Sequence, residues 1–176
     1  MRILVVYESK TGATEQYAQW LAEELGTQSL ALESCSIAQL QNCDLIVFGG
    51  SVHGGIINGK KKLFRLAEKA GCREVVCFAV GIRPVTQRTL GLIRRSNFGS
   101  AEDGRLFYFR GRFHEGGLDQ RNRTMVRIYR SMLKRRRMLH PEDKEMLEAM
   151  GCSCDFTSRE QIMPLVHTIK QRVRYC

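Results

Sequence analysis

A short loop near the start of the chain combines three hydroxyl side chains, a lysine and a glycine. It reads Ser9-Lys10-Thr11-Gly12-Ala13-Thr14 and follows an unbroken apolar run from Ile3 to Tyr7. Apolar residues then recur at helical spacing from Tyr17 to Leu25, which places the loop between a strand and a helix. The free N–H groups in the first turn of a helix and the positive end of its dipole favour a phosphate group at such a position.

The spacing of this loop excludes two well-known phosphate-binding motifs. Neither the dinucleotide pattern G-x-G-x-x-G nor the Walker pattern G-x-x-x-x-G-K-[ST] follows the strand. The pattern that remains is S-x-T-G-x-T. Hydroxyl residues and glycine also form ordinary caps and turns before helices, so the loop alone leaves that interpretation open.

Two later loops also follow apolar runs. The run Asp44–Phe48 ends in the glycine-rich segment Gly49–Gly55, and the run Val75–Val80 ends in the segment Gly81–Pro84. Glycines allow a backbone to approach a flat ligand closely. His53 titrates near neutral pH and is therefore a candidate proton carrier, although a histidine that is merely solvated or bonded to backbone is the simpler alternative.

The three loops belong to a pattern in which strands alternate with helices. Strands are expected at residues 3–7, more weakly at 28–33, and at 44–48, 75–80 and 105–110. The alternation predicts a parallel sheet with helices on both faces, whose ligands bind beyond the carboxyl ends of the strands. All three loops fall at that edge, which favours one shared binding site.

The helices between and after the strands have recognisable boundaries. The spacing predicts helices from Asn58 to Gly71 and from Pro84 to about Ser96, with Pro84 at the first helical position. A capping-box pattern at Ser158–Gln161 precedes a closing helix that reaches about Arg174. Pro164 should bend or loosen the first turns of this helix. Residues 112–156 therefore form an insertion that is much longer than an ordinary connection.

The insertion contains an amphipathic, basic helix. Apolar side chains follow helical spacing on one side, namely Met125, Ile128, Tyr129, Met132 and Leu133. Basic side chains recur on the opposite side, namely Arg123, Arg127, Arg130, Lys134 and Arg137. A second short helix is expected from Pro141 to just before Gly151. Either the apolar face docks on the domain and the basic face is solvated, or the helix binds an anionic membrane surface, an acidic ligand or an acidic protein.

The composition fits one globular domain spanning residues 1–176. Hydrophobic residues make up 43% and charged residues 26%, and no apolar run is long enough to cross a bilayer. No signal-peptide pattern is present, so we expect a cytoplasmic protein, or one held at the inner face of the membrane. The net charge of +10 favours an acidic partner or an anionic small molecule. Nucleic acid is a weak candidate because no nucleic-acid-binding motif accompanies the charge.

The cysteines give no sign of a metal or disulfide framework. The chain has seven, at positions 35, 43, 72, 77, 152, 154 and 176, without a C-x-x-C pair. We therefore expect free thiols. Cys152 and Cys154 have no histidine nearby, so a plain turn is favoured over a redox or zinc site, and no metal is expected.

On its first loop, the sequence resembles the flavodoxin-like family, whose first strand ends in a T/S-x-T-G-x-T loop around the phosphate of FMN. The second and third loops correspond to segments that lie against the flavin ring in that family. The resemblance implies a three-layer α/β sandwich with a five-stranded parallel sheet in the order 2-1-3-4-5, and FMN as the cofactor. Electron transfer through a flavin needs no protein catalytic residue, so none is assigned. The residues implied for FMN binding are Ser9, Lys10, Thr11, Gly12, Ala13, Thr14, Gly50, Ser51, Val52, His53, Gly54, Gly81, Ile82 and Arg83.

The resemblance is greatest to the menaquinone-dependent protoporphyrinogen oxidase branch of the family. The first loop, the segment GGSVHGG, the basic insertion and Asp155-Phe156-Thr157 carry it. It implies an oxidoreductase at a membrane that passes electrons from a porphyrinogen through FMN to a quinone. The second and third loops lack the ring-stacking aromatic residue of many flavodoxins, which fits a flavin open on one side to a substrate. Two alternatives stay open: an electron carrier that docks acidic redox partners, and a flavin-free binding module.

Overall fold

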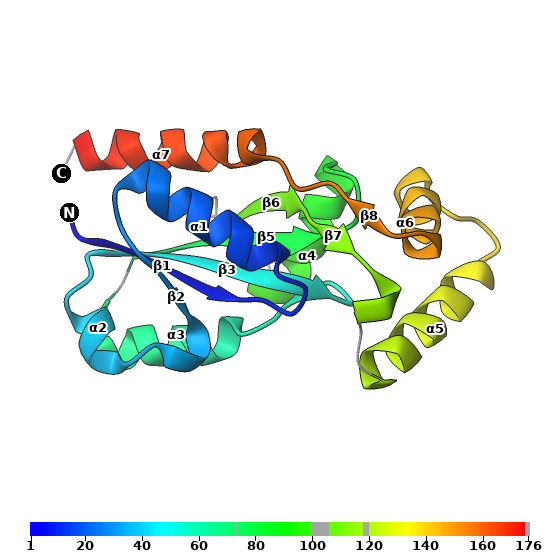
Figure 1. Cartoon of the computed structure of the whole chain (residues 1–176), viewed down its shortest axis with the longest axis horizontal. Helices are drawn as coiled ribbons and strands as arrows, with labels where there is room; N and C mark the ends of the chain where they lie inside the picture. Colours follow the sequence, from blue (N-terminus) through cyan, green and yellow to red (C-terminus); the bar gives the residue numbers. More distant parts are fainter. Residues whose placement is uncertain (73, 100–105, 118–119, 175–176) are drawn as a thin grey trace.

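The computed structural model describes residues 1–72, 74–99, 106–117 and 120–174. Five parallel strands form the centre of the molecule in the order β2-β1-β3-β5-β6 (Figure 1). In chain order they are β1 (Ile3–Glu8), β2 (Ser29–Ala31), β3 (Leu45–His53), β5 (Val75–Gly81) and β6 (Leu106–Arg110). Arg105, the predicted first residue of the last strand, lies outside the described residues.

The predicted number of strands is wrong by one. A short strand β4 (Ile56–Ile57) pairs antiparallel with the end of β3 and makes the sheet six-stranded. When β4 is left out and the five parallel strands are numbered along the chain, their order in the sheet is the predicted 2-1-3-4-5. A two-residue strand shows no apolar alternation by which the sequence could identify it, and β4 forms because Gly54 and Gly55 turn the chain back sharply.

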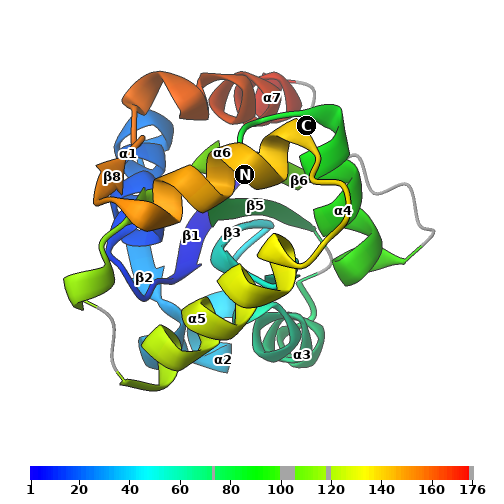
Figure 2. The ribbon, with the colours of Figure 1, turned by 90° about the vertical axis from the view of Figure 1, so that its right-hand side faces the viewer.

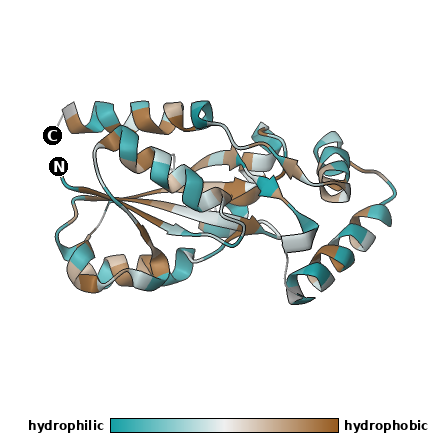
Figure 3. Cartoon of the chain, viewed as in Figure 1, coloured by the Kyte–Doolittle hydropathy of each residue, from teal (hydrophilic) through white to brown (hydrophobic). Residues whose placement is uncertain are grey.

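Helices cover both faces of the sheet, as predicted. One face carries α1 (Ala13–Leu25) and α7 (Met163–Arg174), and the other carries α2 (Ile37–Gln41), α3 (Lys60–Ala70) and α4 (Gln87–Phe98), with a short 3₁₀ turn at Leu32–Ser34. Phe78 faces the first layer and Phe48 the second, and both are fully buried. Because both faces of the sheet are covered, the inner strands are continuous apolar runs, which Figure 3 shows as brown arrows at the centre.

Two predicted helix boundaries need correction. Helix α4 begins at Gln87, because the hydroxyl of Thr86 accepts a hydrogen bond from the N–H of Thr89 at 3.1 Å and caps the helix; Pro84 lies before it. The predicted capping box at Ser158 is also wrong. Ser158 accepts from Glu160, and the chain forms a 3₁₀ turn (Arg159–Ile162) before α7. Pro164 therefore occupies the first turn of α7, which agrees with the expected loosening at that end.

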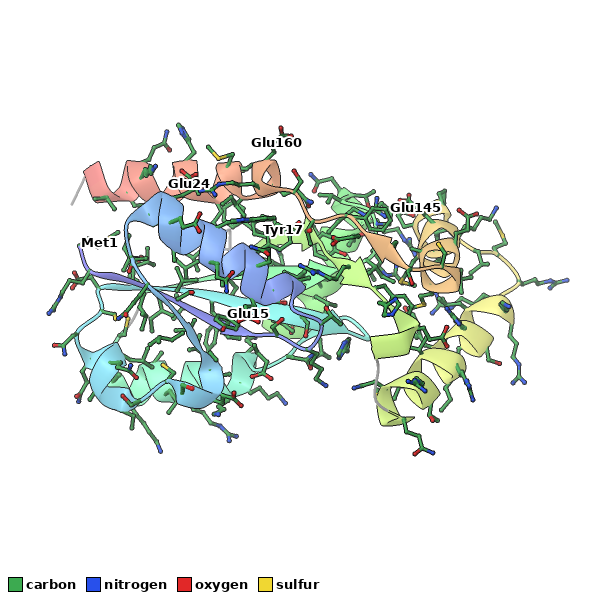
Figure 4. All side chains as sticks on the ribbon, in the orientation of Figure 1. Met1, Glu15, Tyr17, Glu24, Glu145 and Glu160 are labelled. Carbon is green, nitrogen blue, oxygen red and sulfur yellow. The ribbon has the colours of Figure 1, made fainter. Side chains whose placement is uncertain are left out.

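The side chain of Gln161 is used for tertiary contacts. It donates to the hydroxyl of Tyr17 at 2.8 Å and to the carbonyl of Phe156 at 2.7 Å, and it accepts from the N–H of Arg110 at 2.7 Å. The Tyr17 hydroxyl in turn donates to the carbonyl of Arg110 at 2.6 Å. Figure 4 labels Tyr17 on α1, beside the approach to α7. These bonds join α1, β6 and the closing segment next to the carboxyl edge of the sheet.

The insertion has its own small core, and a pair of short strands joins its two ends. Strands β7 (Arg112–Phe113) and β8 (Cys154–Asp155) pair antiparallel, so the two ends of the insertion lie side by side. Between them lie a 3₁₀ turn (Glu115–Gly117), α5 (Gln120–Lys134) and α6 (Pro141–Gly151). Phe113, Leu133, Met146 and Met150 form the buried core of this unit. Figure 2, viewed from the end that bears the insertion, shows α5 and α6 crossing in front of the strand ends.

Two simpler expectations concern the membrane and the cysteines. Within the described part of the chain, no helix is both long and apolar enough to cross a bilayer. The described cysteines, which leave out Cys176, are free thiols. Among the described residues there is also no cluster of three metal-binding side chains.

Candidate functional site

The first loop leads into a helix whose N-terminus has no side-chain cap. Gly12 adopts a left-handed backbone with φ of 79°, and as a glycine it provides no side-chain cap for α1. The N–H of Gly12 donates to Ser9 Oγ at 3.1 Å, so Ser9 stabilises the loop itself. The first N–H groups of α1, from Ala13 onward, therefore stay free for a ligand.

The second loop is more ordered than its glycine content indicates. Strand β3 continues to His53, and Gly54 and Gly55 form a two-residue hairpin turn with φ of 59° and 87°. Asn97 of α4 fixes the hairpin: its side chain donates to the carbonyl of Gly55 at 2.8 Å and accepts from the N–H of Ile57 at 2.9 Å. The predicted loop is thus a strand end and a tight hairpin, which hold His53 on a rigid support.

Gly50, a predicted flavin contact, has a different role in the structure. It is buried within β3, and a Cβ atom there would lie 2.5 Å from the backbone oxygen of Asn58 and from the side chain of Ile57. The glycine is needed because the chain after the hairpin packs directly over it. Gly50 does not line the cavity described below, and neither do Ser9 and Gly12.

The third loop is held by hydrogen bonds from β6 and from the residue that follows it. The carbonyl of Gly81 accepts from the N–H of Gly111 at 2.7 Å, and the carbonyl of Arg83 accepts from the Tyr108 hydroxyl at 3.0 Å. The guanidinium of Arg110 donates to the carbonyl of Ile82 at 3.3 Å and stacks on the ring of Phe156, 3.7 Å from its centre. Burial strongly raises the pKa of Tyr108, which keeps its hydroxyl protonated as a donor.

Parallel register brings the three loops to one edge of the sheet. Glu8 pairs with Gly50, Ser51 with Val80, and Gly81 with Arg110, so the strands end within a few residues of one another. A cavity of about 740 Å³ opens at this edge. The predicted site residues that line it are Lys10, Thr11, Ala13, Thr14, Ser51, Val52, His53, Gly54, Gly81, Ile82 and Arg83.

The opposite wall of the cavity comes from the insertion, which the sequence did not assign to the site. Met125, Ile128, Tyr129 and Met132 of α5 line it, together with Met146 and Met150 of α6. Met125, Ile128 and Met132 are each more than half exposed, at 53%, 57% and 56%, because they face this open space. The amphipathic pattern was the available signal, but it could not indicate which surface the apolar side would face.

The apolar and the basic side of α5 therefore make different contacts in the structure. Leu133 is fully buried in the core of the insertion, whereas the neighbouring apolar side chains point to the cavity. On the basic side, Arg123 donates to the carbonyl of Gly116 at 3.2 Å and Arg130 forms an ion pair with Glu115 at 3.2 Å. Arg137 lies beyond the helix end at Lys134. The basic face is therefore only partly free.

The insertion is fastened to the third loop by ion pairs. Arg83 lies 2.6 Å from Asp143, which is 1% exposed, and it donates to the Tyr129 hydroxyl at 3.0 Å. Arg110 lies 2.7 Å from Glu145, which Figure 4 labels on α6. Among the described residues, neither carboxylate oxygen of Asp143 accepts a well-aligned hydrogen bond. Its negative charge is instead balanced by the positive charges of Arg83 and of Arg136, which lies 3.6 Å away.

The cavity is positively charged. Lys10, Arg83 and Arg112 line it, whereas none of its lining residues in the described part of the chain is an acid. Arg83 is neutralised by Asp143, and Arg112 lies 3.7 Å from Asp155. Lys10 has no ion pair with a described residue and remains an uncompensated charge at the first loop. Burial, and then the charge of Lys10, lower the pKa of His53 below its ordinary value.

A doubly wound three-layer α/β fold with its cavity at the carboxyl edge defines the class of this protein. The sequence from residue 4 to residue 139 matches the family model of the flavodoxin domain. The chain therefore belongs to the flavodoxin domain family. No curated protein sequence matches it significantly.

Several solved structures are similar to this chain at low sequence identity. A flavodoxin from the domain Archaea is 16% identical with a TM-score of 0.46, covering 74% of this chain and 98% of its own. Reduced flavodoxin from Megasphaera elsdenii is 16% identical with a TM-score of 0.44, covering 84% and 97%. Rubredoxin oxygen:oxidoreductase from Desulfovibrio gigas is 12% identical with a TM-score of 0.45, covering 85% of this chain and 36% of its own.

Proposed function

We propose that this protein is an FMN-dependent oxidoreductase in which the inserted helices form the wall of a substrate site beside the flavin. The observation that carries the proposal is the cavity of about 740 Å³ between the strand-end loops and α5. Its volume lies within the range of about 300–1,000 Å³ that is typical of ligand sites. A flavodoxin domain with no second ligand would not need an apolar wall opposite its cofactor.

The first loop fits the phosphate of FMN. The uncapped first turn of α1 offers N–H groups, Thr11 and Thr14 offer hydroxyl groups, and Lys10 supplies a positive charge. The second and third loops offer Val52 and Ile82 as apolar surface and the backbone around Gly81 for polar ring atoms. When bound, FMN supplies the reversible uptake of electrons, and the protein supplies position and electrostatics.

The far wall fits a second, flat and mainly apolar molecule. Methionine side chains adapt to irregular shapes, and Met125, Met132 and Met146 contribute to this wall. The excess of positive charge in the cavity favours acidic groups on that molecule. A reduced ring compound that carries carboxylate groups has this chemistry, and a quinone would accept the electrons removed from it. Such a substrate pair is what membership of the protoporphyrinogen oxidase branch would require.

The basic outer surface of α5 and the residues after it supports a second part of the proposal. Arg127, Lys134, Arg135 and Arg137 are exposed and have no ion pair with a described residue. We propose that this surface holds the protein at an anionic membrane, where quinones dissolve. The cavity opens beside the same helix, so membrane contact would bring an apolar acceptor close to the flavin.

The principal alternative is an electron carrier without its own substrate. Two substitutions in the apolar wall separate the alternatives: Ile128→Gln and Met132→Gln, combined in one variant. The proposal expects FMN affinity within about threefold of the wild type and at least a tenfold loss in the rate of electron transfer to menadione, a quinone. Met138→Gln is the matched control, because Met138 is 86% exposed and does not line the cavity.

Equal rates of menadione reduction by all three proteins would contradict the substrate site and favour the carrier. A protein that binds no FMN would instead favour the flavin-free module.

A further inference from the structure

His53 is positioned by a hydrogen-bond network that determines where its proton lies. Its Nδ1 atom lies 3.0 Å from Nδ2 of Asn58, which also donates to Ser51 Oγ at 3.0 Å. An amide nitrogen can only donate, so Nδ1 of His53 must accept. In the neutral ring the proton then lies on Nε2. Both hydrogens of the Asn58 amide are used, one on each acceptor.

Asn58 itself is held in place by backbone. Its N–H donates to the carbonyl of Ser51 at 3.0 Å, and its own carbonyl packs against Gly50, where a Cβ would lie 2.5 Å away. The β3–β4 hairpin supports His53 from the other side, through the contacts of Asn97 with Gly55 and Ile57. Both partners of the His53–Asn58 bond are therefore fixed by the fold, so the ring has a defined orientation.

The surroundings disfavour a charged imidazole. A proton on Nδ1 would point at the Asn58 amide hydrogen, which is a donor facing a donor. The charged groups that line the cavity with His53 are Lys10 from the first loop, Arg83 from the third loop and Arg112 from β7. Arg83 is paired with Asp143 and Arg112 with Asp155, so the charge that acts on His53 is that of Lys10. Tyr108 and Tyr129 also line it. Partial burial and Lys10 lower the pKa of His53.

We propose that His53 is a neutral hydrogen-bond donor, through Nε2–H, to an acceptor atom of bound FMN, and that Asn58 is the positioning residue that maintains this state. The inference rests on the proposed function. A flavin ring carries carbonyl oxygens and ring nitrogens that accept hydrogen bonds, and His53 lines the same cavity as Lys10, Thr11 and Thr14 of the first loop. A neutral donor binds the ring without adding a further positive charge.

Substitutions at the two residues make the inference testable by FMN binding, measured as quenching of flavin fluorescence. His53→Leu removes the donor and should raise the Kd by about 3–10-fold, the effect of one lost hydrogen bond. His53→Gln keeps an N–H donor and should stay within about twofold of the wild type. The phosphate of FMN titrates near pH 6, and this changes the Kd of the wild type and of each variant alike. The ratio of variant to wild-type Kd removes that shared effect.

Asn58→Asp tests the positioning role through pH. A carboxylate accepts from Nδ1–H, so it should raise the pKa of His53 and move the neutral proton from Nε2 to Nδ1. At pH 6 the charged ring still donates from Nε2, and the Kd ratio should be near one. At pH 8 the ring has lost that proton, and the ratio should rise several-fold. Histidine ring ¹⁵N shifts should report Nε2–H in the wild type and a higher pKa in the variant.

The possible results separate this inference from the proposed function. If the wild type binds FMN and His53→Leu binds equally well, or the Asn58→Asp ratio is independent of pH, the role of His53 is wrong while the flavin site stands. If the wild type itself binds no FMN, the proposed function fails and this inference fails with it. Circular dichroism of each variant confirms that a weaker Kd does not reflect unfolding.

Discussion

The guanidinium of Arg83 and the carboxylate of Asp143 lie 2.6 Å apart and join the third loop of the sheet edge to the second helix of the insertion. Arg83 belongs to the cavity wall, and Asp143 belongs to the element that covers it. The pair therefore ties the position of α6, and through Tyr129 that of α5, to the loop that lines the cavity. Breaking this contact should lower both the free energy of unfolding and the affinity for a ligand in the cavity.

Replacing Asp143 with asparagine tests the contact energetically. Asp143 is 1% exposed and Arg83 is 18% exposed, so the substitution leaves a largely buried guanidinium without its counter-charge. We expect a loss of about 2–4 kcal/mol in the free energy of unfolding, measured with urea. Glu145→Gln is the matched control, because Glu145 is 46% exposed and its ion pair with Arg110 should be worth less than about 1 kcal/mol. Equal losses in the two variants would contradict the special role of the Arg83–Asp143 pair.

Local patterns predicted the sheet, its parallel order and most helices, because covered parallel strands are continuous apolar runs and amphipathic helices repeat every three to four residues. They did not predict contacts between distant segments. Nothing near Arg83 indicates that Asp143 will meet it, since the contact depends on how the insertion folds back over the strand ends. The apolar side of α5 was recognised, but the surface opposite Ile128 and Met132 is created only by the tertiary fold.

Glycines are a second feature whose role local patterns do not determine. The sequence predicts Gly50 as a ligand contact; in the structure, the backbone of Asn58 that packs over this position requires a glycine. Gly54 and Gly55, which the sequence places in a loop, form the tight turn of a hairpin. A glycine in a sequence indicates either that another group packs closely against the backbone or that the backbone adopts a special conformation. It does not indicate which neighbouring group requires the glycine. The same ambiguity does not affect Thr11 and Thr14, which line the cavity.

Those two threonines provide a test of the phosphate site. Replacing both with valine keeps their volume and removes hydroxyl donors next to the uncapped end of α1. We expect the Kd for FMN to rise about tenfold or more, since hydrogen bonds to a charged group are worth about 1.5–3 kcal/mol. Thr168→Val is the control, because Thr168 bonds to the carbonyl of Pro164 on α7, away from the cavity. An unchanged Kd in the double variant would place the phosphate elsewhere.

Tyr17 should influence stability at alkaline pH. Burial raises its pKa to about 12, so the folded state retains the proton more tightly than the unfolded chain, whose tyrosines titrate near 10. The stabilisation is complete below pH 10 and is lost as the pH rises towards 12. Tyr17→Phe should cost about 1–3 kcal/mol at pH 7 because it leaves the partners of the hydroxyl unpaired.

Because phenylalanine does not titrate, the difference in unfolding free energy between Tyr17→Phe and the wild type should shrink between pH 10 and 11.5. Urea titrations at several pH values measure it. The cysteines and lysines titrate in both proteins, so their effects cancel in the comparison. A difference that stays constant over this range would show that Tyr17 ionises as readily in the folded protein as in the unfolded chain.

The membrane proposal has its own test in sedimentation with vesicles that contain phosphatidylserine. Changing Arg127, Lys134 and Arg137 to glutamine should reduce binding markedly at low salt, at roughly 1 kcal/mol for each charge near the surface. The matched control removes the same charge from α3, through Lys61, Lys62 and Lys69 to glutamine. These three lysines are exposed on a helix distant from the insertion (Figure 1). If the two triple variants bind alike, net charge alone governs binding and the α5 surface has no special role.

The most direct test of the account is the visible absorption spectrum of the protein purified from cells supplied with riboflavin, followed by titration of the stripped protein with FMN. We expect a yellow protein with flavin absorption bands, and quenching of FMN fluorescence that saturates at one equivalent. A colourless protein that also fails to quench FMN fluorescence would contradict the central claim that the cavity at the strand ends is a flavin site.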